Sequence, residues 1–268
     1  MPTLPDPPPP YYTDERATLY QADALAVLAA LPTASVDALI TDPPYSSGGQ
    51  YKGDRTAATG LKYGGESMSD FSGDNRDQRS HLTWMNLWLL ESLRVVRPGG
   101  VCALFTDWRQ LPTTTDALQV GGWVWRGVVP WAKPSGRPAF KQRAWLNQCE
   151  YVVWGTAGSS AVTPDGSTQP LPGFYTAAPP REREHQTQKP LEVMRALCRI
   201  APEGGTVLDP FAGSGTTGVA ALIEGRQFVG IEMVEHYATV AANRLRTVAH
   251  GYRDDGQQDA LDLGEATA

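Results

Sequence analysis

The fold class is indicated most clearly by the segment Thr206-Val-Leu-Asp-Pro-Phe-Ala-Gly-Ser-Gly-Thr-Thr217. It predicts a strand that ends at Asp209, followed by a loop of small residues that opens a helix. Glycines let a backbone approach a ligand closely, and a helix N-terminus favours negative charge. The next predicted strand, Gln227–Glu232, ends in an acid that can bind both hydroxyls of a ribose. The segment therefore predicts a site for a nucleoside-containing cofactor.

Around this segment, predicted strands alternate with predicted helices along most of the chain. Such alternation is typical of an α/β fold with a mostly parallel sheet and helices on both faces. We expect a Rossmann-like sheet of seven strands. The strands are predicted at 17–20, 36–41, 101–105, 123–131, 150–154, 206–209 and 227–232, and the helices at 24–31, 82–96, 109–120, 191–200, 216–224 and 237–249.

Composition excludes several classes of protein. With 41% hydrophobic and 19% charged residues among 268, the chain as a whole is not disordered. No stretch of about 18 apolar residues predicts a transmembrane helix, and the N-terminus lacks the pattern of a secretory signal. The three cysteines and four histidines have neither disulfide nor metal-ligand spacing. We expect a cytoplasmic protein without a metal site.

The net charge of −6 is unevenly distributed. Residues 251–268 carry one Arg and five acids, whereas residues 121–145 carry five basic residues and no acid. A local basic stripe is typical of contact with nucleic-acid phosphates, although a solvated surface face is the alternative interpretation. The basic residues are Arg126, Lys133, Arg137, Lys141 and Arg143.

A second motif, Thr41-Asp-Pro-Pro-Tyr45, follows the predicted strand Val36–Thr41. Its prolines fix the backbone and remove two N–H donors. The Asp42 carboxylate and the neighbouring carbonyls can then accept hydrogen bonds from an exocyclic amino group. Tyr45 offers a flat face for stacking a base. The motif predicts a site that holds a planar amine, and a simple Pro-Pro turn is the alternative.

The two motifs together resemble the DNA amino-methyltransferases, which methylate N6 of adenine or N4 of cytosine with S-adenosylmethionine. Asp42–Tyr45 looks like their catalytic motif and Asp209–Thr216 like their cofactor motif. His185–Pro190 is similar to a segment of the circularly permuted, beta-type members, in which the catalytic motif comes first, as here. Tyr20–Leu25 is similar to their segment around the cofactor adenine, with Ala22 where Gly is often found.

The resemblance implies a role for each site residue. Glu232 would bind the cofactor ribose and Asp23 its adenine, although Asp23 also suits a helix N-cap. Lys189 would lie near the cofactor, with a surface charge beside a helix start as the alternative. Catalysis would fall to Asp42, Pro43, Pro44 and Tyr45. The cofactor site would comprise Asp23, Asp42, Lys189, Asp209, Phe211, Gly213, Ser214, Gly215, Thr216, Thr217 and Glu232, and the five basic residues of the stripe would bind DNA.

The resemblance also implies how the chain is organised. The methyltransferase domain would span 16–250, between a flexible Pro-rich lead (1–15) and an acidic disordered tail (251–268). Within it, 46–80 would contact the target and 157–188 would form a short target-recognition region. Double-stranded DNA is the expected partner, a homodimer and a restriction endonuclease partner stay open, and a bacterial cell or phage-infected host is the expected setting.

Asp at position 42 favours adenine N6 over cytosine N4, because relatives with Ser there more often act on cytosine. C5-cytosine methylation is excluded, since it would need a Cys after Pro and no cysteine here follows a proline. Three alternatives stay open: an RNA or protein amino-methyltransferase, a non-catalytic DNA-binding protein and an NAD-dependent oxidoreductase. An NAD-dependent oxidoreductase would not explain the presence of the Asp42–Tyr45 motif.

Overall fold

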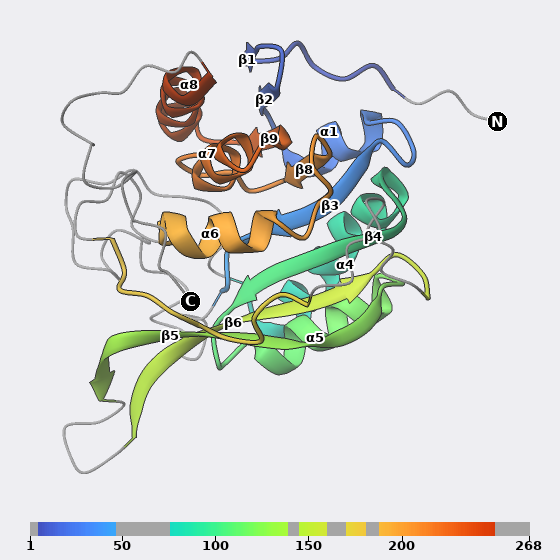
Figure 1. Ribbon diagram of the computed structural model, residues 1–268. Coiled ribbons are helices and arrows are strands. Elements are labelled where there is room, and N and C mark those ends of the chain that lie inside the picture. Colours follow the sequence, from blue (N-terminus) through green and yellow to red (C-terminus); the bar gives the residue numbers. More distant parts are fainter. Residues whose placement is uncertain (1–4, 47–75, 139–144, 160–169, 181–187, 250–268) are drawn as a thin grey trace.

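The computed structural model describes residues 5–46, 76–138, 145–159, 170–180 and 188–249. They form one sheet in the order β1-β2-β9-β8-β3-β4-β6-β5-β7 (Figure 1). The central strands β2, β9, β8, β3 and β4 are parallel, whereas β6 pairs antiparallel with both β4 and β5. This is the predicted Rossmann-like α/β arrangement.

The elements have the following bounds. The strands are β1 (Tyr12–Thr13), β2 (Ala17–Gln21), β3 (Val36–Thr41), β4 (Val96–Thr106), β5 (Val124–Pro138), β6 (Leu146–Thr156), β7 (Tyr175–Thr176), β8 (Thr206–Asp209) and β9 (Gln227–Glu232). The helices are α1 (Ala24–Ala30), α4 (Gln78–Val95), α5 (Leu111–Val120), α6 (Leu191–Cys198), α7 (Thr216–Ile223) and α8 (Glu235–Ala249). Every helix among the described residues is too short or too polar to cross a bilayer.

Two apolar cores lie on opposite faces of the sheet. Alternate side chains of a strand point to opposite faces, and β3 shows this directly: Ala38 and Ile40 belong to one core and Leu39 to the other. The first core packs against α6, α7 and α8, and the second against α1, α4 and α5 (Figure 1). Both faces of the parallel strands are therefore covered, which explains why these strands are continuous apolar runs.

The sheet order brings the two sequence motifs together. Strands β3 and β8 are parallel neighbours, with Ala38 opposite Val207 and Leu39 opposite Leu208. Both strands therefore end at the same edge of the sheet, and Asp42 and Asp209 lie on adjacent strand ends. In open α/β sheets, ligands bind at the carboxyl ends of the strands.

The structure differs from the sequence predictions at the sheet margins. The sheet has nine strands instead of seven, because two-residue strands extend it at both edges. One of them, β1, lies in the lead expected to be flexible, where it pairs antiparallel with β2. Strand β4 also begins before the predicted residue 101, with an irregularity between the pairs Val36–Val96 and Ala38–Val101. Helix α4 begins at Gln78, before the predicted 82, because Asp77 caps it through the N–H groups of residues 79 and 80.

A substitution at Gly218 tests how tightly α7 packs on the sheet. A Cβ there would lie 2.6 Å from Phe228 Cε1 and 2.7 Å from Leu245 Cδ2. Gly218→Ala should gain about 1 kcal/mol of helix propensity but lose about 1–3 kcal/mol to overpacking. We expect a lower free energy of unfolding in urea. Gly173→Ala, where nothing lies within 4 Å of the added Cβ, is the control and should be near neutral. A more stable Gly218→Ala variant would contradict the packing described for α7.

Candidate functional site

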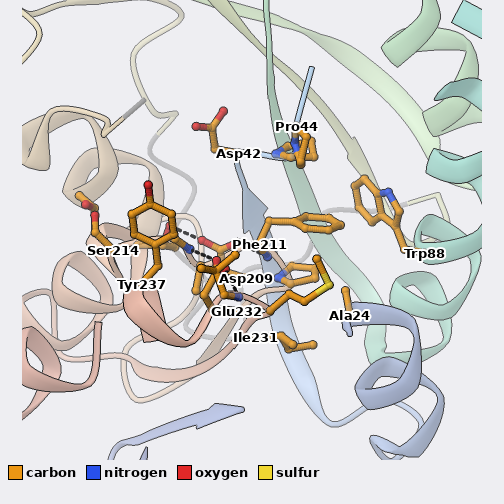
Figure 2. Close-up of a pocket in the computed structure, with 18 of the residues that line it drawn as sticks. Ala24, Asp42, Pro44, Trp88, Asp209, Phe211, Ser214, Ile231, Glu232 and Tyr237 are labelled. Atoms are coloured by element: carbon orange, nitrogen blue, oxygen red, sulfur yellow. Dashed lines mark hydrogen bonds between the residues drawn. The ribbon is translucent and has the colours of Figure 1, made fainter. Parts of the chain in front are cut away.

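One continuous cavity contains residues of both motifs. The Asp42–Tyr45 segment lines one part of it, and the loop after β8 together with the end of β9 lines another. Figure 2 shows Asp42 and Pro44 at one end, Ala24 and Ile231 at the other, and the Phe211 ring between them. A ligand that fills this cavity would touch both motifs at once.

The buried Asp209 carboxylate joins the two motifs. Its Oδ1 accepts hydrogen bonds from the Thr41 hydroxyl (2.6 Å) and the Phe211 N–H (3.0 Å), and its Oδ2 accepts one from the Thr217 hydroxyl (2.6 Å). Burial raises the pKa of Asp209 to about 6, against the lowering effect of these hydrogen bonds. Asp209 lines the cavity, and its oxygens tie β3, the loop and α7 together.

The loop between β8 and α7 has a backbone that requires glycine. Gly215 is the N-cap of α7 with φ of 81°, in the left-handed region, and its Cβ position lies 2.9 Å from Ala241 Cβ. Arg244 of α8 holds the loop by donating to the Ser214 carbonyl (2.7 Å) and to the hydroxyls of Ser214 and Thr216 (both 3.1 Å). The loop is therefore fixed in shape before any ligand binds. Arg244 was not among the predicted site residues.

Glu232 occupies the place predicted for a ribose-binding acid. Its Oε2 accepts from the Gly213 N–H (2.9 Å) and its Oε1 from the Val234 N–H (2.8 Å). Burial raises the pKa of Glu232, while these backbone donors oppose the rise. The two bonds fix the carboxylate at the cavity wall, and each oxygen keeps capacity for a further donor.

An aromatic cluster forms the apolar wall of the cavity. The Phe211 ring lies 5.3 Å from that of Trp84 and 5.1 Å from that of Trp88 between centroids, and Trp88 is fully buried. Flat apolar walls of this kind suit a planar ring. Only Phe211 was predicted. Trp84 and Trp88 were missed, although their spacing of four on a predicted helix places them on one face.

Asp23 lines the cavity and also caps α1. Its Oδ1 accepts from the N–H groups of Leu25 (2.9 Å) and Ala26 (3.2 Å). The alternative interpretation of Asp23 as an N-cap is thus confirmed. It is compatible with a ligand contact, since Asp23 lines the same cavity as Glu232.

At the other end of the cavity, Asp42 is held by two partners. Its Oδ1 accepts from the Tyr45 hydroxyl (2.6 Å), and its Oδ2 pairs with Lys189 Nζ (2.6 Å). Burial raises the pKa of Asp42, although Lys189 opposes the rise. Lys189 is only 5% exposed, so its alternative as a surface charge is wrong. It also lies over one face of the Tyr45 ring, 5.2 Å from the centroid.

Glu150 of β6 completes this end and was not predicted. Its Oε2 pairs with Lys189 Nζ (3.0 Å) and accepts from the Tyr45 hydroxyl (3.2 Å), and its Oε1 pairs with Lys133 Nζ (2.5 Å). Burial would raise the pKa of Glu150, but the two ammonium groups outweigh it and hold that pKa at about 2. The one signal in the sequence is an acid at the start of an otherwise apolar predicted strand.

Of the predicted basic stripe, the structure describes the side chains of Arg126 and Lys133. Arg126 lies at the beginning of β5, where it donates to the Thr156 hydroxyl (3.1 Å) and the Ser159 carbonyl. Lys133 lies near the other end of β5, in the pair with Glu150. Arg137 follows in the same strand, and Lys141 and Arg143 lie outside the described residues. Strand β5 therefore separates Arg126 from Lys133, although the two are close in the sequence. Most of the predicted target loop and recognition region, at 47–75, 160–169 and 181–187, also lies outside them.

Comparison with known proteins gives a family. The model of a family described as DNA methylase, with N6 and N4 in its name, matches residues 36–243. These residues run from β3 through most of α8 and so include both motifs and the cavity between them.

Individual relatives are similar to this protein over most of its chain. The putative methylase YubD of Escherichia coli (strain K12) is 28% identical over 92% of this chain and 97% of that protein. The type II methyltransferase M2.LlaDCHI of Lactococcus lactis subsp. cremoris is 26% identical over 88% of this chain and 91% of that protein. A crystal structure of the M1.HpyAVI–SAM complex has a TM-score of 0.62 and 25% identity, and the match covers 85% of this chain and 98% of that one.

Thr217→Val tests the Asp209 junction. The substitution keeps the shape but removes a donor to a buried carboxylate, which should cost about 1–3 kcal/mol of stability. The hydroxyl stabilises the ionised carboxylate more than the protonated one. The loss should therefore grow as pH rises through about 6, the pKa of Asp209. Urea unfolding at pH 5 and pH 8 measures the difference.

The control is Thr83→Val, which removes an exposed hydroxyl on α4 that donates to the Arg79 carbonyl. It should change stability by less than about 0.5 kcal/mol at either pH. An equal loss for Thr217→Val at both pH values would contradict the prediction, because it would show that Asp209 does not change its ionisation between pH 5 and pH 8.

Proposed function

We propose that this chain, which belongs to the DNA methylase family and methylates DNA with S-adenosylmethionine, acts on the exocyclic N6 of adenine. The observation that supports transfer to an exocyclic amino nitrogen is the shared cavity with Asp42–Tyr45 at one end and Glu232 and Phe211 at the other. The first group suits an amino nitrogen and the second a nucleoside. A shared cavity allows the cofactor and the target amine to meet.

The residues present fit the cofactor. Glu232 offers a fixed carboxylate to the ribose hydroxyls, and the walls formed by Phe211, Trp88 and Ile231 suit the adenine ring. The loop 213–217, with its glycines and the N-terminus of α7, would lie against the methionine end. When bound, S-adenosylmethionine supplies an electrophilic methyl group on its sulfonium.

Asp42 has the central part in the chemistry. The lone pair of an aromatic amino group is delocalised into the ring, and hydrogen bonds from its N–H groups to acceptors localise that pair on nitrogen. Asp42 is such an acceptor, because its oxygens can accept more bonds than those from Tyr45 and Lys189. The Pro43 carbonyl would be the second acceptor. Both hold the nitrogen for direct displacement, so positioning and electrostatics supply most of the rate.

The target base would be flipped out of the duplex, since its amino group is otherwise out of reach. Pro44 and Tyr45 line the cavity where the base would sit. Lys189 covers one face of the Tyr45 ring, so the proposed stacking uses the other. For phosphate contact, Arg137, Lys141 and Arg143 remain the proposed residues, whereas Lys133 is engaged with Glu150.

The choice of adenine rests on Asp42 itself. In the family that the motif resembles, Ser at this position more often accompanies cytosine. The second candidate is therefore N4 of cytosine, for which the same acceptors and the same cavity would serve. The two differ in the base that the site accepts, and the product distinguishes them.

The product assay is the direct test. Unmethylated genomic DNA is incubated with labelled cofactor and the protein, then digested to nucleosides. We expect N6-methyladenine from the wild type and at least ~100-fold less from Asp42→Ala, because the acceptor of the amino group is gone. N4-methylcytosine would overturn the adenine proposal and keep the mechanism. Product with RNA but not with DNA would overturn the choice of substrate.

Cofactor binding tests the other end of the cavity. Glu232→Gln replaces one acceptor oxygen with an amide and should weaken S-adenosylmethionine at least ~10-fold, the loss expected for a hydrogen bond to a charged group. Isothermal titration without DNA measures the dissociation constant. Glu235→Gln, an exposed acid at the start of α8, should bind as the wild type does. Equal weakening in both variants would argue against the ribose role of Glu232.

A further inference from the structure

Four charged side chains and one hydroxyl form a network beside the Asp42 end of the cavity. Lys189 Nζ lies between two carboxylates, 2.6 Å from Asp42 Oδ2 and 3.0 Å from Glu150 Oε2. The Tyr45 hydroxyl contacts the same two carboxylates, at 2.6 Å and 3.2 Å. Glu150 thus touches both groups that hold Asp42, and it is anchored from the far side by Lys133 at 2.5 Å.

The network balances two negative charges with two positive ones. Without Glu150, Lys189 would have Asp42 as its one carboxylate partner among these residues, and the group would carry a net positive charge. A buried ammonium paired with one carboxylate would bind it tightly and weaken it as an acceptor. With Glu150 in place, Lys189 is shared, so Asp42 is oriented without being fully neutralised.

We propose that Glu150 is a positioning residue for methyl transfer, which acts through Lys189 and keeps the Asp42 carboxylate available to the target amino group. This inference rests on the proposed function, in which Asp42 accepts from that group, and it applies equally to adenine and cytosine. Glu150 differs from Asp42 in where it lies: it sits on β6, in the antiparallel part of the sheet, and comes to the site from beside β4.

The charges around Asp42 determine how it titrates. Lys189 opposes the rise in the Asp42 pKa that burial causes, whereas Glu150 adds to that rise. Asp209 and Asp107 are the other acids nearby, since Asp42 raises the pKa of Asp209 and Asp107 raises that of Tyr45. Because the pKa of Glu150 is held at about 2, it stays ionised while Asp42 titrates.

Removal of the Glu150 charge therefore has a defined sign. Glu150→Gln takes away a negative charge that raises the Asp42 pKa, so that pKa should fall. Methyl transfer needs ionised Asp42 and is lost as pH drops through its pKa, so the acidic limb of the kcat profile should move to lower pH. At its plateau kcat should be about 10- to 100-fold lower, because Asp42 is bound more tightly by Lys189. KM for cofactor and DNA should change little.

Carboxyl ¹³C NMR gives a readout without cofactor or DNA. In protein labelled at Asp Cγ, the resonance that Asp42→Asn removes is assigned to Asp42 and titrated in wild type and Glu150→Gln. We expect the variant to titrate at lower pH. An unchanged Asp42 titration, or a kcat loss with no shift of the acidic limb, would overturn the inference and leave Glu150 as a structural residue.

Two further variants separate this role from a loss of stability. Glu224→Gln removes a similarly buried carboxylate, which pairs with Arg195 (2.7 Å) and Arg199 (2.8 Å) away from the cavity. It should lower stability without moving the Asp42 titration. Lys133→Met spares Glu150 and serves where Glu150→Gln does not fold. It should not lower the Asp42 pKa, and a lowering would contradict the inference.

The product assay and the NMR titration together distinguish failure of the inference from failure of the proposed function. If wild-type protein methylates no nucleoside in DNA, the proposed function fails while the NMR titration can still be read. If the wild type is active and Glu150→Gln matches it in kcat and pH profile, the inference alone fails.

Discussion

The Asp209 carboxylate is the junction on which the site depends. One of its oxygens binds Thr41, the last residue of β3, and the other binds Thr217, in the first turn of α7. Thr41 and Asp209 are 168 residues apart in the chain. Because Asp42 follows Thr41 directly, these two bonds fasten the Asp42–Tyr45 motif to the glycine loop, in addition to the pairing of β3 with β8. Burial raises the pKa of Asp209 to about 6, because the ionised carboxylate loses its hydration there.

The carboxylates at the two ends of the cavity have different kinds of partner. Around Glu232 and Asp209 the carboxylates are held by N–H and O–H donors, and no ammonium or guanidinium group pairs with either among the contacts described above. Around Asp42 and Glu150 the carboxylates are held by Lys189 and Lys133. The first arrangement leaves the charge of the carboxylates without a paired cation among these contacts, which suits the sulfonium of the proposed cofactor. The second arrangement is near-neutral, which suits the neutral base of the proposed function. This division follows from the partners of each acid and agrees with the proposed roles.

The sequence predicted what depends on local pattern. Strands β3, β8 and β9 have the predicted bounds, because each is a buried apolar run that ends at a polar turn. Glu150 could not be found in this way. Its role depends on β6 pairing with β4, which no local pattern specifies, and an isolated acid in a strand gives no hint of its partners. Arg126 and Lys133 are likewise close in the sequence but separated along the extended strand β5.

The geometry of the site depends on strand position and not on the order of the motifs in the chain. Parallel strands place their carboxyl ends at one edge, so β3 and β8 need only be neighbours for Asp42 and the glycine loop to face one cavity. The catalytic motif can then precede the cofactor motif, as it does here, without any change in the contacts between them. Glu150 contacts Lys189 and Tyr45 of that cavity from an antiparallel strand, whose beginning lies at the edge where the parallel strands end. Because β6 runs antiparallel to β4, its first residues lie beside the carboxyl ends of the parallel strands. A parallel strand in this place would approach Asp42 only with its last residues.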